Sequence, residues 1–143
     1  TPENQTFEIG KAVKLQEGSD VTIIATGHLV WEALEASKIL FEKGISAEVL
    51  NIHTIKPLDD EAIIKSISKT RCVVTAEEHN YLGGLGESVA RVLVKNNPVP
   101  QEFVATNDTF GESGTPKQLM EKYGINFQSI VNSSIRVIKR KNN

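Results

Sequence analysis

The chain has 143 residues, of which 39% are hydrophobic and 24% are charged, and its formal net charge is −2. This length suits one domain spanning residues 1–143, and the near balance of charge excludes a broad electrostatic surface for nucleic acid or an anionic membrane. No stretch approaches the roughly 18 consecutive apolar residues of a membrane span. The chain begins at Thr1 without a methionine, which favours a fragment of a longer polypeptide.

The single cysteine, Cys72, lies in an apolar run. A disulfide within the chain is therefore excluded, and a buried, inert thiol in a reducing cytoplasm is the expected state.

The first part of the chain predicts an N-terminal hairpin or edge strand, then a central strand and a long helix. Residues 1–17 predict a hairpin or edge strand, and residues 21–26 are apolar on both faces, as in a central strand. Residues 29–43 have helical spacing that would leave Trp31 outside the buried stripe, either packed on the flank or contacting a partner, and Gly44 suits a left-handed cap. The expected stripe is Val30, Ala33, Leu34, Ser37, Leu40 and Phe41.

The middle of the chain predicts a second, third and fourth strand at residues 47–52, 71–76 and 102–106. Asp59 would cap a short helix between the first two of these strands. A further helix over residues 87–95 would turn Val89, Ala90, Leu93 and Val94 inward.

The C-terminal part predicts two helices. Thr115 and Pro116 begin one that closes at Gly124, and Asn126 begins the last, which ends in the basic run 139–141, expected to be a solvated tail. Strands alternating with helices predict an α/β fold: a three-layer α/β/α sandwich with a mostly parallel sheet of about five strands.

Polar residues follow three of the predicted strands. His28, His53 and His79 end different elements and lack the close pairing of zinc motifs, so a metal site is disfavoured. Because the ends of parallel strands meet at one edge of a sheet, these histidines and Glu77 could instead form a polar rim for an anion or a partner. Three separate solvated histidines are equally compatible with the sequence.

The segment between Glu77 and Gly86 offers two further interpretations. Neighbouring Glu77 and Glu78 should point to opposite faces, one buried by partners and one exposed, so they cannot act as paired carboxylates. The turn at Gly83, Gly84 and Gly86 could hold a phosphate on free amides, let a helix pack closely on a strand, or allow a close contact with another subunit. Its spacing does not match a dinucleotide or P-loop fingerprint, and residues 110–115 miss the pattern G-x-S-x-G. The residues alone therefore predict no catalytic, cofactor-binding or metal-binding side chain.

Five ordered blocks nevertheless resemble the C-terminal domain of transketolases, especially the form made as a separate C-terminal half in many bacteria and archaea. The resemblance covers almost the whole chain and rests on the blocks GSDVTIIATG, NIHTIKPLD, VTAEEHN, GGLG and DTFGESG. The resemblance implies an enzyme that transfers a two-carbon ketol unit between sugar phosphates with thiamine diphosphate and Mg²⁺. In that family the cofactor is held by the N-terminal and pyrimidine-binding domains across a dimer interface, and no cofactor-binding motif matches this sequence.

The resemblance therefore implies a domain that binds no cofactor by itself, is inactive alone, and supports a homodimer together with the missing domains. Two alternative functions are also compatible with the sequence. One is a regulatory module that binds a small anion or a nucleotide at the strand ends. The other is the C-terminal domain of the beta chain of a 2-oxo acid dehydrogenase.

Overall fold

The computed structural model describes residues 11–53, 57–78, 84–105 and 126–143. Its centre is a five-stranded sheet in the order β1-β3-β2-β4-β5. The strands are β1 (Val13–Gln16), β2 (Val21–Ala25), β3 (Ala47–Asn51), β4 (Val73–Glu77) and β5 (Gln101–Ala105). All neighbouring pairs are parallel except β1 with β3, which is antiparallel.

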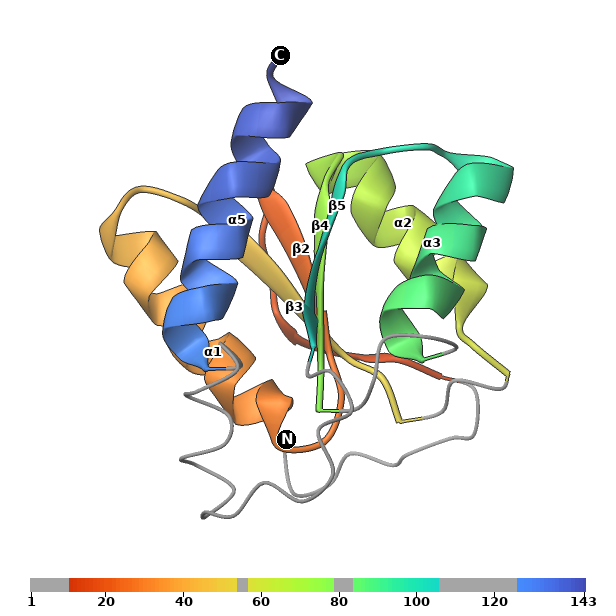
Figure 1. Cartoon of the computed structure of the whole chain (residues 1–143), viewed down its shortest axis with the longest axis horizontal. Coiled ribbons are helices and arrows are strands. Elements are labelled where there is room, and N and C mark those ends of the chain that lie inside the picture. Colours follow the sequence, from red (N-terminus) through yellow and green to blue (C-terminus); the bar gives the residue numbers. More distant parts are fainter. Residues whose placement is uncertain (1–10, 54–56, 79–83, 106–125) are drawn as a thin grey trace.

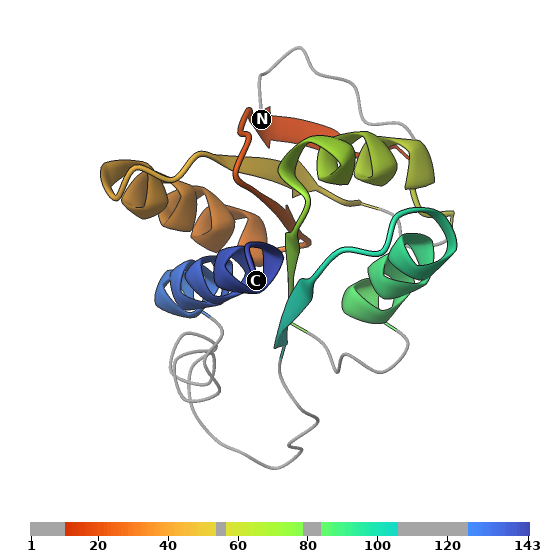
Figure 2. The same cartoon turned by 90° about the horizontal axis from the view of Figure 1, so that it is seen from above.

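Helices cover both faces of this sheet. α1 (Leu29–Glu42) and α5 (Phe127–Lys141) lie on one face, and α2 (Asp60–Thr70) and α3 (Leu85–Asn96) lie on the other (Figures 1 and 2). The predicted three-layer α/β/α sandwich with a mostly parallel sheet is therefore confirmed. The predicted helix between Thr115 and Gly124 lies outside the described residues.

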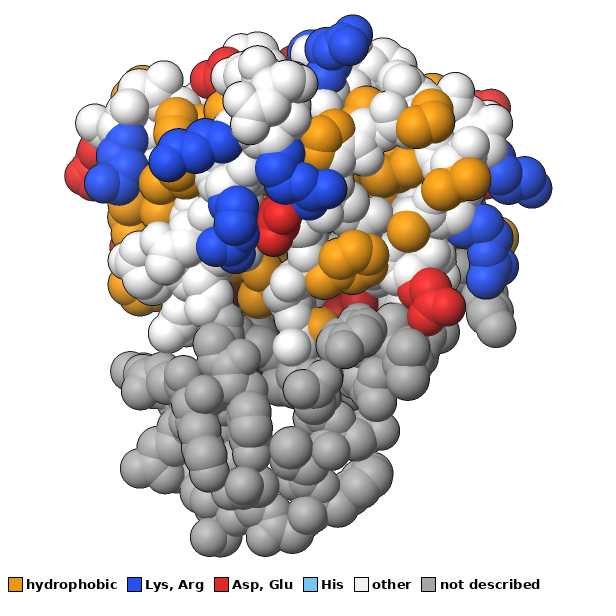
Figure 3. Space-filling model, turned by 45° about the horizontal axis from the view of Figure 1, so that its top comes forward, with side chains coloured by type: hydrophobic (Ala, Val, Ile, Leu, Met, Phe, Trp, Pro, Cys, Tyr) orange, Lys and Arg blue, Asp and Glu red, His pale blue; other side chains and the backbone are white. Residues whose placement is uncertain are grey.

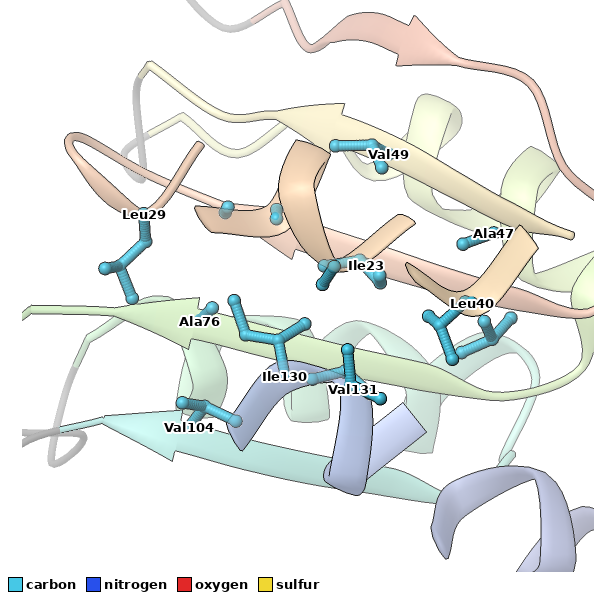
Figure 4. Packing of buried hydrophobic residues seen from close by; sticks show 14 of the residues in the cluster. Ile23, Leu29, Leu40, Ala47, Val49, Ala76, Val104, Ile130 and Val131 are labelled. Carbon is cyan, nitrogen blue, oxygen red and sulfur yellow. The ribbon is translucent and has the colours of Figure 1, made fainter. Parts of the chain in front are cut away.

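The sheet separates two hydrophobic cores because side chains alternate along each strand. Ile23 of β2 packs into the core beneath α1 and α5, whereas its neighbour Ile24 packs into the core beneath α2 and α3. Figure 4 shows the first core, in which Leu40, Ile130 and Val131 meet the sheet. Every residue of β2, β3 and β4 is buried, as expected for strands covered on both sides.

Predicted helix ends are mostly confirmed. The Asp59 carboxylate accepts a hydrogen bond from the Ala62 amide at 3.2 Å, and the Asn126 side chain accepts one from the Ser129 amide at 3.0 Å. Gly44 has a φ of 84°, the left-handed conformation expected after α1. β4 begins at Val73 rather than at Arg71, because Arg71 itself is the left-handed cap of α2 with a φ of 66°.

Two predicted core residues are exposed. Phe41 and Val94 are 76% and 75% exposed, respectively. In α1 the buried stripe runs through Leu29, Ala33, Ala36 and Leu40, which leaves Phe41 about 100° away from its centre. In α3, Val92 is buried and Val94 is not, because Val94 likewise lies away from the centre of that helix's buried stripe.

The basic run at the end of α5 is not a solvated tail. Arg140 Nη1 donates to the Gln101 carbonyl at 2.8 Å and to Glu102 Oε2 at 2.7 Å. Lys141 Nζ donates to the carbonyls of Asp20 and Thr70 at 2.7 and 2.9 Å. The last turn of α5 thus joins β5 to the beginning of β2 and the end of α2. Figure 3 brings this end forward and shows basic side chains spread over it, with an acidic side chain among them.

Cys72 is fully buried, and this burial raises the pKa of its thiol to about 11. The expected burial of this thiol is confirmed. Among the helices in the described part of the chain, none combines the length and hydropathy that a membrane span requires.

Candidate functional site

The carboxyl ends of the three central strands lie at one edge of the sheet. Ala25 of β2 lies beside Asn51 of β3 and Ala76 of β4, in parallel register. The chain therefore brings four residues to this edge, which we call the strand-end rim: His28, His53, Glu77 and Glu78. His79 and Gly83, which the sequence also assigned to this site, lie outside the described residues.

Glu77 is the most constrained residue of the strand-end rim. It is only 3% exposed, and its carboxylate accepts hydrogen bonds from the backbone amides of Leu85 at 2.9 Å and Gly86 at 2.6 Å. These amides form the first turn of α3, where the helix cap Gly84 offers no side chain. A carboxylate there satisfies two unpaired donors and interacts favourably with the helix dipole. This cap also explains why α3 begins at Leu85, two residues earlier than predicted.

The hydrogen bonds from α3 to Glu77 also limit phosphate binding at the glycine turn. A phosphate held there would use the free amides of the helix terminus. Two of those amides, of Leu85 and Gly86, are already bound to Glu77. Within the described residues, this part of the turn is therefore filled by the chain's own anion.

Gly86 is required for close packing of α3 on the sheet. A Cβ atom at this position would lie 2.5 Å from the Phe103 ring and 3.0 Å from Thr75 Oγ1. Gln101 Nε2 also donates to the Gly86 carbonyl at 2.9 Å. Of the interpretations given to the glycine turn, the geometry of Gly86 favours helix-to-strand packing.

Glu78 faces a different partner from Glu77. Its Oε1 accepts a hydrogen bond from the backbone amide of His28 at 3.0 Å, and the residue is half-buried rather than exposed. The two adjacent carboxylates therefore stabilise separate elements, α3 in one case and the turn before α1 in the other. This agrees with the expectation that they do not work as an acid and base pair.

The histidines of the strand-end rim are exposed. His28 stands at the N-cap of α1 without a capping side-chain bond, and His53 follows β3. Within the described ranges, no three His, Cys, Asp or Glu side chains gather closely enough to hold a metal ion.

The sequence of the chain matches a known protein family. Residues 10–130 match the family model described as "Transketolase, C-terminal domain". The chain belongs to the transketolase C-terminal domain family. The resemblance drawn from the five sequence blocks is confirmed.

The relatives of this transketolase C-terminal domain include separate subunits. It is 50% identical over 140 residues to a 6-deoxy-6-sulfo-D-fructose transketolase subunit of Clostridium sp., covering 98% of this chain and 44% of that protein. It is 39% identical to an apulose-4-phosphate transketolase subunit of Phocaeicola vulgatus, covering 96% of this chain and 45% of that one. A solved structure described as "Split gene transketolase, inactive beta4 tetramer" superposes with a TM-score of 0.94 at 43% identity, covering 99% of this chain and 46% of that chain. The chain thus spans less than half the length of these relatives.

A second polar cluster of the domain was missed by sequence reasoning. Glu48 of β3 is 1% exposed, and its carboxylate accepts hydrogen bonds from Lys69 Nζ, from Ser66 Oγ at 2.7 Å and from the Gly18 amide at 3.2 Å. Burial by itself would raise the pKa of Glu48, but the hydrogen bonds from Lys69, Ser66 and Gly18 outweigh it and hold the pKa below its ordinary value. A carboxylate inside an apolar strand was the available signal, because a buried charge needs partners.

Buried hydroxyl groups extend this cluster. Thr22 Oγ1 lies 2.7 Å from Ser66 Oγ and 2.6 Å from Thr70 Oγ1, which joins β2 to α2. All of these side chains contact other parts of the same domain. The cluster therefore holds α2 against the sheet and offers no open nucleophile.

Trp31 is the largest exposed apolar side chain of α1. It is 71% exposed and lies three residues after His28, on the part of α1 nearest the strand-end rim. Of its two interpretations, packing on the flank of the helix is therefore wrong. An exposed tryptophan is enriched where proteins contact one another.

Proposed function

We propose that this domain is the C-terminal part of a transketolase-type thiamine diphosphate enzyme that transfers a two-carbon ketol unit between sugar phosphates. Within that enzyme the domain serves assembly, and catalysis belongs to the other domains. The family membership and the relatives named as transketolase subunits support the enzyme class. The observation that carries the assembly role is Glu77, whose carboxylate is used to cap α3 instead of facing a substrate.

The described residues do not fit the cofactor of that reaction. No set of metal ligands gathers among them, and the Leu85 and Gly86 amides that a diphosphate could use are bound to Glu77. In this proposal, thiamine diphosphate and Mg²⁺ are held by the N-terminal and pyrimidine-binding domains, with which this domain forms a homodimeric enzyme in the cytoplasm.

The exposed end of α1 supports a contact with those domains. Trp31 is 71% exposed, and tryptophan is enriched among the residues that contribute most to contacts between proteins. We place the interface at Trp31 and the adjoining strand-end rim, where His28 and His53 are also exposed.

An activity measurement tests this function. The isolated chain, supplied with thiamine diphosphate, Mg²⁺ and a ketose phosphate donor with an aldose phosphate acceptor, should show no ketol transfer. Addition of the remaining domains of the enzyme should restore turnover. Clear turnover by the chain alone would overturn the assembly role, and absence of turnover from the completed mixture would count against the enzyme class.

The alternatives make different predictions about this chain. A regulatory module would bind sugar phosphates or nucleotides without any other domain, and its affinity should fall when His79 is replaced by alanine. A 2-oxo acid dehydrogenase parent would be recognised from the coding sequence upstream, which would lack the sugar-phosphate residues of a transketolase. At the strand-end rim, no contact between described residues favours either alternative over assembly.

A further inference from the structure

A pocket of about 360 Å³ lies between α2 and β1, which is an edge strand of the sheet. Its lining combines three apolar residues, three lysines and two buried polar residues: Ala12, Leu50 and Ala62; Lys14, Lys65 and Lys69; and Glu48 and Ser66. We call it the lysine pocket. β1 and α2 approach each other at this edge, as Figure 2 shows, and the Ala12 amide donates to Asp59 Oδ2, just before α2, at 2.8 Å.

Two of the three ammonium groups are held in place by carboxylates. Lys14 Nζ lies 3.1 Å from Glu17 Oε2, and Lys69 Nζ is hydrogen-bonded to Glu48 and lies 3.6 Å from Glu17 Oε1. Lys65 is exposed and forms no hydrogen bond or ion pair within the described part of the chain. The pocket therefore has two fixed lysines and one that is available to a ligand.

The charge of the lining favours an anion. Three lysines line the pocket, whereas two carboxylates contact them, those of Glu17 and Glu48, so one positive charge is left in excess. The Glu48 oxygens are already bound to Lys69, Ser66 and the Gly18 amide, so they repel an incoming anion less than an unpaired carboxylate would. Leu50 is part of the core beneath α2 and contributes an apolar surface to the lining, beside the buried polar side chains of Glu48 and Ser66.

We propose that the lysine pocket binds a small organic anion, with its phosphate or carboxylate head at Lys65 and Lys69 and a short apolar body over Ala62 and Leu50. The volume lies within the range of sites for small ligands, and such sites combine an apolar lining with few polar groups that fix orientation. This site is separate from ketol transfer and requires none of the other domains of the enzyme.

Nuclear magnetic resonance of the ¹⁵N-labelled chain tests the proposal with hexyl phosphate and hexanoate as probes. Both should shift the backbone amides of Ala62, Lys65 and Lys69 in a saturable way, with dissociation constants in the millimolar range. The stronger of the two identifies the preferred head group. Hexanol lacks the charge and inorganic phosphate lacks the apolar body, so both should bind more weakly than hexyl phosphate.

Matched lysine variants separate the pocket from general charge attraction. Lys65→Ala should weaken hexyl phosphate binding about three- to five-fold, and Lys65→Glu should weaken it further. Lys38→Ala removes the same charge from α1, on the opposite face of the sheet, and should leave binding unchanged. A dispersed spectrum like that of the original chain shows that each variant is folded.

Three results would overturn the proposal. They are the absence of saturable shifts on α2, equal weakening by Lys65→Ala and Lys38→Ala, and equal binding of inorganic phosphate and hexyl phosphate. The first removes the site, the second reduces it to non-specific attraction, and the third removes the role of the apolar part of the lining.

Discussion

At the scale of single residues, the strand-end rim is stabilised by carboxylates that bind backbone amides. Glu77 accepts two such bonds from α3, and Glu78 accepts one from the turn before α1. Each carboxylate thus positions the beginning of a helix. The two side chains are therefore not both available for a shared reaction, which supports the proposal that this edge serves assembly.

Replacing Glu77 by glutamine should destabilise the domain by about 1–3 kcal/mol. The glutamine amide can accept only one of the two hydrogen bonds, because its NH₂ group faces a second donor, and its neutral side chain loses the interaction with the α3 dipole. Urea unfolding at neutral pH, followed by far-ultraviolet circular dichroism, measures the change.

Glu78→Gln is the matched control for Glu77→Gln. It removes the same charge from the neighbouring residue, which is half-buried and accepts a hydrogen bond from the His28 amide at 3.0 Å. Its effect should be smaller, about 0.5–1 kcal/mol. Equal losses of unfolding free energy in the two variants would show that the two amide hydrogen bonds to Glu77 stabilise the domain no more than the single hydrogen bond to Glu78.

The sequence anticipated part of this residue-level arrangement. The burial of one of the two neighbours Glu77 and Glu78 was predictable, because successive side chains in an extended segment point to opposite faces. The partners of Glu77 did not follow, because they are backbone amides eight and nine residues later whose position depends on how α3 packs. Glu48 was missed for a similar reason, since its partner Lys69 lies 21 residues away on α2.

At the scale of elements, the positions of helices and strands were predictable because residues close in sequence mark where each element lies. Asp59 and Asn126 mark helix beginnings, and β-branched apolar runs mark the central strands. Which face of a helix is buried was less predictable. Phe41 and Val94 fit the helical spacing but are exposed, because the direction of each stripe is set by the sheet and the neighbouring helix.

The Glu48 cluster predicts a specific pH dependence of the contact between α2 and the sheet. The folded-state pKa of Glu48 is lowered from 4.5, so its contribution to stability is complete above that value and is lost as the pH falls through the folded-state pKa. Glu48→Gln should therefore destabilise the domain by about 1–3 kcal/mol at neutral pH, and by less in acid. Urea unfolding of both proteins at about pH 7 and about pH 3.5 measures the difference.

Glu42→Gln controls for the general effect of removing a carboxylate. Glu42 is exposed near the end of α1, and its substitution should change stability by less than about 0.5 kcal/mol at either pH. A destabilisation by Glu48→Gln that is the same at both pH values would contradict the assignment of the pH dependence to Glu48.

At the scale of the whole molecule, the sandwich follows from the alternation of strands and helices, whereas the surfaces that contact other domains do not. Periodicity specifies which side chains leave solvent within one chain. It cannot distinguish an exposed residue that stays in water from one that is covered in an assembly. The sequence could not make this distinction for Trp31, because the helical pattern indicated only that Trp31 lies outside the buried stripe.

Trp31 is also the only tryptophan in the sequence, so it reports directly on the proposed interface. In the isolated chain its 71% exposure predicts a long-wavelength emission that acrylamide quenches readily. Addition of the remaining domains of the enzyme should shift this emission to shorter wavelength and reduce the quenching, because the indole leaves water. The double variant Trp31→Phe with Phe41→Trp moves the probe to the opposite end of α1, where 76% exposure should persist in the complex. An unchanged Trp31 signal in a mixture that has regained ketol transfer would exclude this end of α1 from the interface, and protection of both probes would extend the interface along the whole helix.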